Sequence, residues 1–203
     1  MKKLIMLGSG GHAQALLSSK LVYHIDGLVS FEKETNLPFK ILGNDDILIG
    51  KEQQYKLING IGSVEIMGPR KRVYEKFSKQ GFEFVGYNQE DSKFNGTGIQ
   101  ILKGAIIQDG VSIGENTIIN NQAILSHGTS IGKHCHIAPG AVLSGGVTVG
   151  DCTHVGAGSI IIQCVKIGRY VTIGAGSIII KDIPDFHRVI GNPARQIGLN
   201  QTF

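Results

Sequence analysis

The C-terminal half of the chain carries an aliphatic residue at every sixth position. The series has fourteen consecutive members. They are Ile101, Ile107, Ile113, Ile119, Leu125, Ile131, Ile137, Leu143, Val149, Val155, Ile161, Ile167, Ile173 and Ile179. The residue four places after each of them is nearly always small or β-branched. A six-residue unit provides one short strand and one turn, so the aliphatic residue points into a narrow interior and the small residue fills a corner. The repeat therefore predicts a parallel β-helix from Ile101 to roughly Pro184.

A longer period of eighteen residues is superimposed on the period of six. An aliphatic residue followed by glycine recurs at this interval, and a charged residue follows each pair. The pairs are Ile113-Gly114, Ile131-Gly132, Val149-Gly150 and Ile167-Gly168. Three six-residue units then close one triangular coil, and stacked coils bring like residues about 4.8 Å apart. These periods exclude heptads and amphipathic helices in this region.

The N-terminal segment has a different pattern. Residues 3–7 form an apolar run that predicts a buried strand, and a glycine-rich turn and an apolar-periodic helix through about Ser19 follow it. Gly8, Gly10 and Ala13 fit the pattern G-x-G-x-x-G/A, in which a helix N-terminus and a closely approaching backbone receive a phosphate group. The segment is predicted to bind a phosphate-bearing ligand, with a purely structural βαβ unit as the alternative.

Further apolar runs predict strands near residues 25–30, 56–62 and 82–87, and a helix over 69–80. These elements make a half-sized Rossmann-like sheet. Because a full dinucleotide domain contains two such halves, we expect a nucleotide sugar or a single nucleotide rather than NAD. The predicted organisation is an α/β half-Rossmann-like domain over 1–92 and an all-β parallel β-helix with a C-terminal capping segment over 93–203.

Composition narrows the classes of partner. The 29 glycines among 203 residues are about twice the usual frequency and fit repeated tight turns. The net charge of +4 comes from dispersed Lys and Arg, so nucleic-acid binding is not indicated. We find no signal-peptide pattern and no apolar run near the ~20 residues a bilayer requires, and we expect a cytoplasmic protein without a membrane partner. Cys135, Cys152 and Cys164 match no metal-ligand spacing and are expected to be free buried thiols.

One of the seven histidines stands out by its place in the repeat. His127 occupies a position where other repeats carry a charged residue or a proline, so it does not point into the aliphatic interior. An imidazole with an ordinary pKa near ~6.5 suits removal of a proton from a nucleophile. We predict that His127 is a general base, with an inert surface histidine as the alternative. His134 and His154 are expected to be solvated flank residues.

Taken together, the half-Rossmann segment and the hexapeptide repeats resemble the bacterial nucleotide-aminosugar N-acetyltransferases and the related sialic acid O-acetyltransferases. The resemblance spans essentially the whole chain. It is carried by the repeat, by Gly8-Ser9-Gly10-Gly11-His12 and by Gly191-Asn192-Pro193-Ala194-Arg195 near the end. It implies a left-handed β-helix, acetyl-CoA as the acyl donor, no metal, and a homotrimer that binds CoA between neighbouring subunits.

The resemblance also assigns roles to residues of this chain. His127 matches the general base, and His136 matches the position that contacts acetyl-CoA near the thioester, with a solvated flank residue as the alternative for His136. The remaining acetyl-CoA contacts it implies are Ala157 and Ala175 along the pantetheine arm and Lys181 and Arg195 near phosphate. The nucleotide-sugar contacts it implies are Gly10, Gly11, His12 and Gly62.

The expected function is acetyl-CoA-dependent N-acetylation of a nucleotide-linked 4-amino-4,6-dideoxy sugar for bacterial surface glycan synthesis, by direct transfer. Two departures keep alternatives open. Gly128 follows His127 where most of the aminosugar enzymes have glutamate, and some O-acetylating relatives have glycine there. Ser30-Phe31-Glu32 stands where many members have adjacent aspartates. O-acetylation of a sialic-acid-type sugar and a non-catalytic β-helix binding module are the alternative functions.

Overall fold

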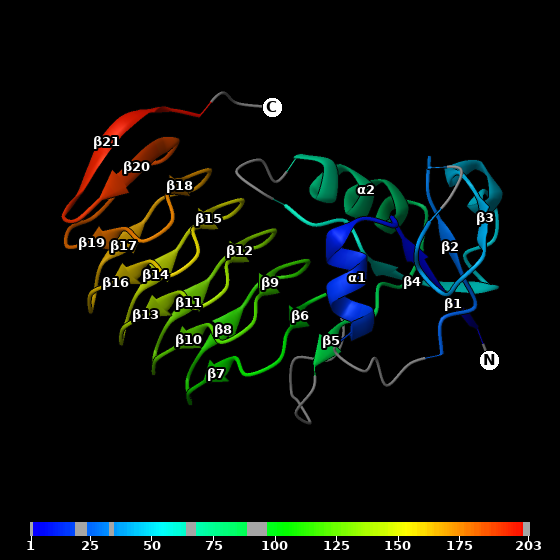
Figure 1. Cartoon of the computed structure of the whole chain (residues 1–203), viewed down its shortest axis with the longest axis horizontal. Helices are drawn as coiled ribbons and strands as arrows, with labels where there is room; N and C mark the ends of the chain where they lie inside the picture. Colours follow the sequence, from blue (N-terminus) through cyan, green and yellow to red (C-terminus); the bar gives the residue numbers. More distant parts are fainter. Residues whose placement is uncertain (1, 19–23, 33–34, 64–67, 89–96, 201–203) are drawn as a thin grey trace. The chain divides into compact units, whose positions relative to one another are not determined.

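The computed structural model describes residues 2–18, 24–32, 35–63, 68–88 and 97–200. Their contacts divide them into two units, one formed by the described residues before Ile99 and one by those from Ile99 onward. The boundary expected between residues 92 and 93 lies outside the described residues. Figure 1 shows helices and strands in the first unit and stacked short strands in the second.

The first unit is built on a parallel four-stranded sheet with the order β3-β2-β1-β4. Its elements in chain order are β1 (Lys3–Leu7), α1 (Gly11–Ser18), β2 (Gly27–Val29), β3 (Ile41–Gly43), the 3-10 helix η1 (Asp45–Leu48), β4 (Tyr55–Asn59), α2 (Gly68–Lys79) and β5 (Tyr87–Asn88). The strands expected at 3–7, 25–30 and 56–62 and the helix expected at 69–80 are all present. The expected α/β character of this segment is therefore confirmed.

The core of the first unit is aliphatic on the sheet side and aromatic on the helix side. Ile5 and Leu7 of β1 are buried together with Leu57 of β4, and they pack in one cluster with Tyr74 and Phe77 of α2. Burying side chains of this size stabilises a fold by about 1.5–3 kcal/mol each. The apolar run of β1 thus becomes the centre of the sheet, and the glycine turn that follows it is held at the carboxyl edge.

Three stacks of two-residue strands form the second unit. Face 1 contains β7 (Ile106–Ile107), β10 (Ile124–Leu125), β13 (Val142–Leu143), β16 (Ile160–Ile161) and β19 (Ile178–Ile179). Face 2 contains β8 (Ser112–Ile113), β11 (Ser130–Ile131), β14 (Thr148–Val149) and β17 (Lys166–Ile167). Face 3 contains β6 (Gln100–Ile101), β9 (Ile118–Ile119), β12 (His136–Ile137), β15 (His154–Val155), β18 (Thr172–Ile173) and β20 (His187–Gly191). The parallel β-helix predicted from the periods of six and eighteen is confirmed.

The interior of this prism is filled by the repeated aliphatic residues. Twelve of the fourteen are buried, and only Ile107 and Ile113, in the first coil, are half-buried. The expected capping segment is a hairpin in which β20 pairs antiparallel with β21 (Ala194–Leu199). Because β20 also pairs parallel with β18, this hairpin continues face 3.

The three faces differ in the side chains that point outward, which come from the first residue of each strand. On face 1 these residues are aliphatic, and Ile106 and Ile160 are 54% and 40% exposed. On face 2 they are polar, as at Ser112 and Ser130. On face 3 the outward row includes His136 and is largely buried. Only face 1 therefore presents an accessible row of aliphatic side chains.

Two expectations about polar side chains are wrong. His134 and His154 are buried, at 6% and 8% exposure, rather than solvated. His134 Nδ1 lies 3.0 Å from Asn116 Nδ2, and the His154 ring packs against the ring of His136 with centroids 5.0 Å apart. The period of six predicts whether a side chain points into the prism or away from it. It does not predict whether neighbouring residues bury an outward side chain.

Of the three cysteines, Cys135 and Cys152 are buried, as expected, whereas Cys164 is exposed. Burial raises the pKa of the Cys135 thiol, whose Sγ lies 3.2 Å from the carbonyl oxygen of Gly150. No group of three or more His, Cys, Asp or Glu side chains suited to a metal ion occurs in the part of the chain that the structure describes. Within that same part, no helix has the length and hydropathy needed to cross a membrane.

Candidate functional site

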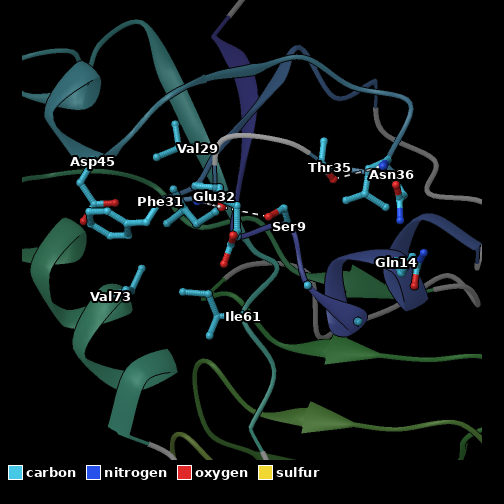
Figure 2. A pocket seen from close by; sticks show the side chains of 16 residues that line it. Ser9, Gln14, Val29, Phe31, Glu32, Thr35, Asn36, Asp45, Ile61 and Val73 are labelled. Carbon is cyan, nitrogen blue, oxygen red and sulfur yellow. Dashed lines mark hydrogen bonds between the residues drawn. The ribbon is translucent and has the colours of Figure 1, made fainter.

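The first unit contains a cavity of about 620 Å³ at the carboxyl ends of β1 and β2. One wall is the glycine turn between β1 and α1. The opposite wall contains Phe31, Glu32 and Asp45, and Ile61 and Val73 also line the space (Figure 2). Ligands of open parallel sheets bind outside the carboxyl ends of the strands. The cavity therefore lies where the sequence predicted a nucleotide-binding turn.

The glycine turn has the geometry of an anion-binding loop. Gly8 adopts a positive φ of 89°, which a residue with a side chain adopts only with strain. A Cβ at Gly10 or Gly11 would meet no heavy atom within 4 Å, so a ligand can approach the backbone there. Because α1 begins at Gly11, its unpaired N–H groups lie in the turn and favour a phosphate. Two of the predicted substrate residues, Gly10 and Gly11, thus line the cavity.

The opposite wall supplies hydrogen-bond acceptors and an aromatic ring. Ser9 Oγ and Ser30 Oγ lie 2.9 Å apart and join the two walls. Phe31 is 78% exposed, so its ring is available for stacking. Asp45 forms an ion pair of 2.7 Å with Lys76, whereas Glu32 has no ionic partner among the described residues. Carboxylates at this place in a Rossmann-like sheet accept hydrogen bonds from ribose hydroxyls. Glu32 therefore has the chemistry of a ribose or base contact.

The other two predicted substrate residues lie against each other. His12 is in α1, and a Cβ on Gly62 would lie 3.0 Å from His12 Cβ, so the turn after β4 packs directly on the first turn of the helix. Neither His12 nor Gly62 lines the cavity. Their neighbour Ile61 does. The turn thus contributes to the site through Ile61 rather than through the residue that the sequence singled out.

Arg70, in the first turn of α2, was missed by the sequence analysis. It is fully buried, and its Nη1 donates to the carbonyl oxygens of Asn59 at 3.0 Å and Ile61 at 2.7 Å. Desolvation lowers the pKa of the guanidinium to about 9. The amide of Asn59 in turn donates to the carbonyl of Arg70. Arg70 therefore fixes the turn that carries Ile61, and nothing in a single sequence distinguishes it from a surface arginine.

His127 lies on the edge of the prism between faces 1 and 2 and is exposed. Backbone hydrogen bonds link Gly128 to Asp109 and Gly146 to His127, so Asp109, His127 and Gly145 follow one another in successive coils. A Cβ on Gly145 would lie 2.6 Å from both Cε1 and Nε2 of His127. The imidazole therefore rests on the surface left free by Gly145. The predicted outward direction of this side chain is confirmed.

The support of the His127 ring comes from packing rather than from a carboxylate. Its backbone N–H donates to Gln108 Oε1 at 2.8 Å, which fixes the turn. No hydrogen bond or ion pair joins the ring to another residue in the described part of the chain. Gly128, at a φ of 67°, occupies the place of the glutamate found in many of the aminosugar enzymes. Within one chain, nothing described replaces that glutamate.

The predicted acetyl-CoA contacts lie at three places on the prism. Lys181 is exposed on the same edge as His127, three coils further along. Ala157 and Ala175 are exposed in successive coils on the edge between faces 3 and 1, where Gly176 N donates to Ala157 O at 2.8 Å. Arg195 is exposed on β21, and His136 lies on face 3. The small side chains at positions 157 and 175 leave a flat strip along that edge, which suits an extended pantetheine arm.

A single chain does not assemble these residues into one site. His127 lies on the edge between faces 1 and 2, and Ala157 lies on the edge between faces 3 and 1. Face 1 separates the two edges, and its outward row is aliphatic. Within one chain, His127 and the alanine edge therefore lie on opposite sides of face 1.

A hexapeptide parallel β-helix together with an α/β unit that carries a glycine-rich turn is the architecture of acyltransferases with hexapeptide repeats. Residues 110–145 and 128–163 match the family described as Bacterial transferase hexapeptide (six repeats). No curated protein matched the chain in a sequence comparison. The predicted enzyme class and the left-handed β-helix are thereby confirmed.

Solved structures narrow the similarity further. The chain is similar to a mutant of perosamine N-acetyltransferase from Caulobacter crescentus in complex with CoA and GDP-perosamine, at 27% identity and a TM-score of 0.87 over 98% of both chains. It is also similar to the acetyltransferase domain of PglB from Neisseria gonorrhoeae, at 25% identity and a TM-score of 0.81 over 97% of this chain and all of that one. WeeI from Acinetobacter baumannii, at 18% identity and a TM-score of 0.76 over 97% of this chain and all of that one, shares the fold. The resemblance to nucleotide-aminosugar acetyltransferases is confirmed.

Proposed function

We propose that the chain transfers an acetyl group from acetyl-CoA to the amino group of a nucleotide-linked 4-amino-4,6-dideoxy sugar in bacterial surface glycan synthesis. The observation that carries the proposal is the pairing, in one chain, of a glycine-turn cavity of about 620 Å³ with a hexapeptide β-helix that exposes His127. The perosamine N-acetyltransferase was solved with CoA and GDP-perosamine, which supports both the donor and the class of acceptor. Because acetyl-CoA would be the donor, we expect the reaction in the cytoplasm.

The proposed reaction is a direct transfer. The sugar nitrogen attacks the thioester carbonyl carbon, a C–N bond forms, the C–S bond breaks and CoA leaves as the thiolate. His127 accepts the proton that the nitrogen loses, because its ring is exposed and has no other described partner. The pyrophosphate of the acceptor binds the N–H groups at Gly10 and Gly11, with His12 and Gly62 in support of that turn. A group that stabilises the oxyanion is also required, and His136 is assigned near the thioester.

The donor fits the flat edge of the prism. The exposed methyl groups of Ala157 and Ala175 stand in successive coils, and a Cβ on Gly158 or Gly176 would meet nothing within 4 Å. An extended pantetheine arm can therefore lie along this edge without displacing a side chain. Lys181 and Arg195 are exposed cations suited to the phosphates of CoA.

The active form is proposed to be a homotrimer. Face 1 presents an aliphatic outward row in which Ile106 and Ile160 are exposed, and continuous apolar patches of this kind mark interaction surfaces. The residues assigned to one reaction lie on both sides of this face, His127 on one edge and Ala157 on the other. Packing of face 1 on a neighbouring copy would cover the aliphatic row and complete the site.

O-acetylation is the second candidate, and it is favoured by one observation. The His127 ring lacks a carboxylate partner among the described residues, and Gly128 stands where the aminosugar enzymes place glutamate. A hydroxyl acceptor on a sialic-acid-type sugar is therefore the alternative substrate. A non-catalytic binding module is a third reading, and it predicts no thiol release.

The test follows CoA thiol release from acetyl-CoA with GDP-perosamine, other nucleotide 4-amino-4,6-dideoxy sugars and free sialic acids as acceptors. We expect release with a nucleotide aminosugar and none with free sialic acids. His127→Ala is expected to lower the rate at least about 100-fold, as for loss of a general base. Full activity of that variant would contradict the role of His127, and thiol release only with sialic acids would favour the second candidate.

A further inference from the structure

A hydrogen bond on face 3 fixes the position of the proton on His136. The His136 side chain is 7% exposed, and its Nε2 lies 3.0 Å from the side-chain nitrogen Nδ2 of Asn120. The orientation of this amide is defined by its other end, because Asn120 Oδ1 accepts the backbone N–H of Asn121 at 2.8 Å. Exchanging the amide oxygen and nitrogen would bring two donors together. Asn120 therefore presents its NH₂ group to the imidazole.

An amide NH₂ group donates and has no lone pair to accept with. Nε2 of His136 must then be the acceptor, and the neutral ring carries its proton on Nδ1. We infer that Asn120 is a positioning residue that holds His136 as the Nδ1–H tautomer, so that His136 acts in acyl transfer as a hydrogen-bond donor and not as a second base. The catalytic part of this inference rests on the proposed function, in which His136 lies near the thioester.

Packing holds the plane of the same ring. The His154 ring, one coil further along face 3, meets the His136 ring edge to face at 74° with centroids 5.0 Å apart. The two strands are in register, with His136 opposite His154. Hydrogen bonding by Asn120 and contact with His154 together restrict the orientation of the imidazole.

A fixed Nδ1–H group suits one step of the reaction. When the acceptor nitrogen attacks the thioester, negative charge develops on the carbonyl oxygen, and a donor positioned beforehand stabilises it without reorganisation. An imidazole whose proton is held on the other nitrogen would offer a lone pair instead and repel that oxygen. Tautomer control by Asn120 therefore separates the role of His136 from that of His127, which removes a proton.

Nitrogen NMR tests the tautomer independently of catalysis. In protein labelled with ¹⁵N-histidine, assigned by comparison with His136→Asn, we expect His136 to show a protonated Nδ1 and an unprotonated Nε2. Asn120→Asp has the same shape but its carboxylate only accepts hydrogen bonds, so it should place a proton on Nε2. Asn116→Asp is the matched control, because Asn116 forms an equivalent pair with His134, and it should leave the His136 signals unchanged. A wild-type His136 protonated on Nε2, or an unchanged tautomer in Asn120→Asp, would overturn the inference.

Kinetics with the best nucleotide aminosugar tests the catalytic consequence. Asn120→Asp should lower kcat about 100-fold, as for loss of an oxyanion donor, with the KM for the nucleotide sugar and the thermal unfolding midpoint unchanged. Asn116→Asp should keep the wild-type kcat. A wild-type kcat in Asn120→Asp would refute the donor role. If the wild-type protein itself transfers no acetyl group, the proposed function fails, and the NMR spectra still decide the tautomer.

Discussion

At the scale of single residues, the position of the candidate base His127 depends on the absence of a side chain at Gly145. The His127 imidazole occupies the space above Gly145, where a Cβ would lie 2.6 Å from Nε2. Gly145 is not among the residues with positive φ, so alanine is compatible with its backbone. The three heavy atoms nearest to a methyl group there all belong to the ring of His127. The lack of a side chain at Gly145 thus allows the His127 ring to lie where it does.

Gly145→Ala is therefore expected to displace the imidazole and lower kcat about 100-fold, the cost of misplacing a catalytic group by about 1 Å. The thermal unfolding midpoint should stay near the wild-type value because the backbone is not strained. Gly198→Ala is the control, since a Cβ there meets no heavy atom within 4 Å. Equal kcat values for the two variants would show that activity does not depend on the packing of the His127 ring on Gly145.

Gly128→Glu tests whether a glutamate directly after His127 would increase the rate of acetyl transfer. A Cβ at Gly128 would make only ordinary contacts, the nearest at 3.8 Å to Gly146 N, and the equivalent place two coils further along is filled by Cys164 at a φ of 62°. The coil therefore accepts a side chain at this place, at a cost of about 1–2 kcal/mol for the left-handed conformation. A carboxylate next to His127 should raise its basicity and increase kcat for an amine acceptor relative to Gly128→Gln, which has the same strain without the charge. An equal or lower rate in Gly128→Glu would mean that the ring works without a carboxylate.

The sequence predicted part of this residue-scale picture. The period of six gave the outward direction of His127 correctly because inward positions are fixed by the aliphatic series. It missed Arg70, whose role depends on two carbonyl groups brought together only by the turn after β4. It also misjudged His154, because its burial depends on residues distant in the sequence.

At the scale of elements, the edge between faces 2 and 3 carries alternating charges in successive coils. Lys133 Nζ pairs with Glu115 at 2.9 Å, and the Arg169 guanidinium pairs with Asp185 at 3.1 Å. Through its hydrogen bond and its charge, Glu115 raises the pKa of Lys133. These charges explain the charged residue that follows each aliphatic-glycine pair of the repeat. Their alternation keeps like charges from meeting at the ~4.8 Å spacing of stacked coils.

The pairing of Asp185 predicts a pH dependence. The backbone N–H of Arg169 and then its guanidinium hold the pKa of Asp185 below the ordinary value of 3.8. A depressed carboxyl pKa stabilises the fold above the ordinary value, and this contribution is lost as the pH falls through the folded-state pKa. Wild-type protein should therefore unfold at a slightly higher temperature than Asp185→Asn at pH 6, and the difference should vanish toward pH ~2. The effect is small because both groups are exposed and water screens their interaction. A difference that grows on acidification would contradict this sign.

Elements with strong patterns were predicted well, and short or irregular ones were not. The strands of the β-helix and β1, α2 and β4 follow from periodicity. The strand β3 has only three residues, Ile41–Gly43, too few to show a period. The last strand expected at 82–87 is reduced to an isolated bridge between Leu57 and Phe84 and to β5. Its aromatic side chains pack into the core, so burial produced a strand-like pattern without a regular strand.

At the scale of the whole molecule, the expected trimer is tested by the aliphatic row on face 1. Ile160→Lys places a charge within this row and should convert a species of about three times 21.8 kDa into monomers in light scattering after size exclusion. Acetyl transfer should be lost with it, because His127 and Ala157 then no longer share a site. Ser130→Lys adds the same charge to the polar outer row of face 2 and should stay trimeric. A trimeric, active Ile160→Lys protein would exclude face 1 as the interface.

The architecture of the molecule was predictable because each half has its own period, and the function was predictable only in class. The repeat predicts a prism, and the glycine turn predicts a phosphate site. In the proposed function, the choice of acceptor depends on Phe31, Glu32 and Gly128, and these are single residues without a period. Their relevance to the acceptor can be inferred only when the structure places them in the cavity and on the prism edge.

The most direct test of the central claim is identification of the acetylated product by mass spectrometry after incubation with acetyl-CoA and a nucleotide-linked 4-amino-4,6-dideoxy sugar, with GDP-perosamine as the first acceptor. Treatment of the product with hydroxylamine distinguishes an amide from an ester, because only the ester is cleaved. The proposed function predicts one added acetyl group that resists hydroxylamine and that does not form with His127→Ala. A hydroxylamine-labile product, or no product with any nucleotide aminosugar, would contradict it.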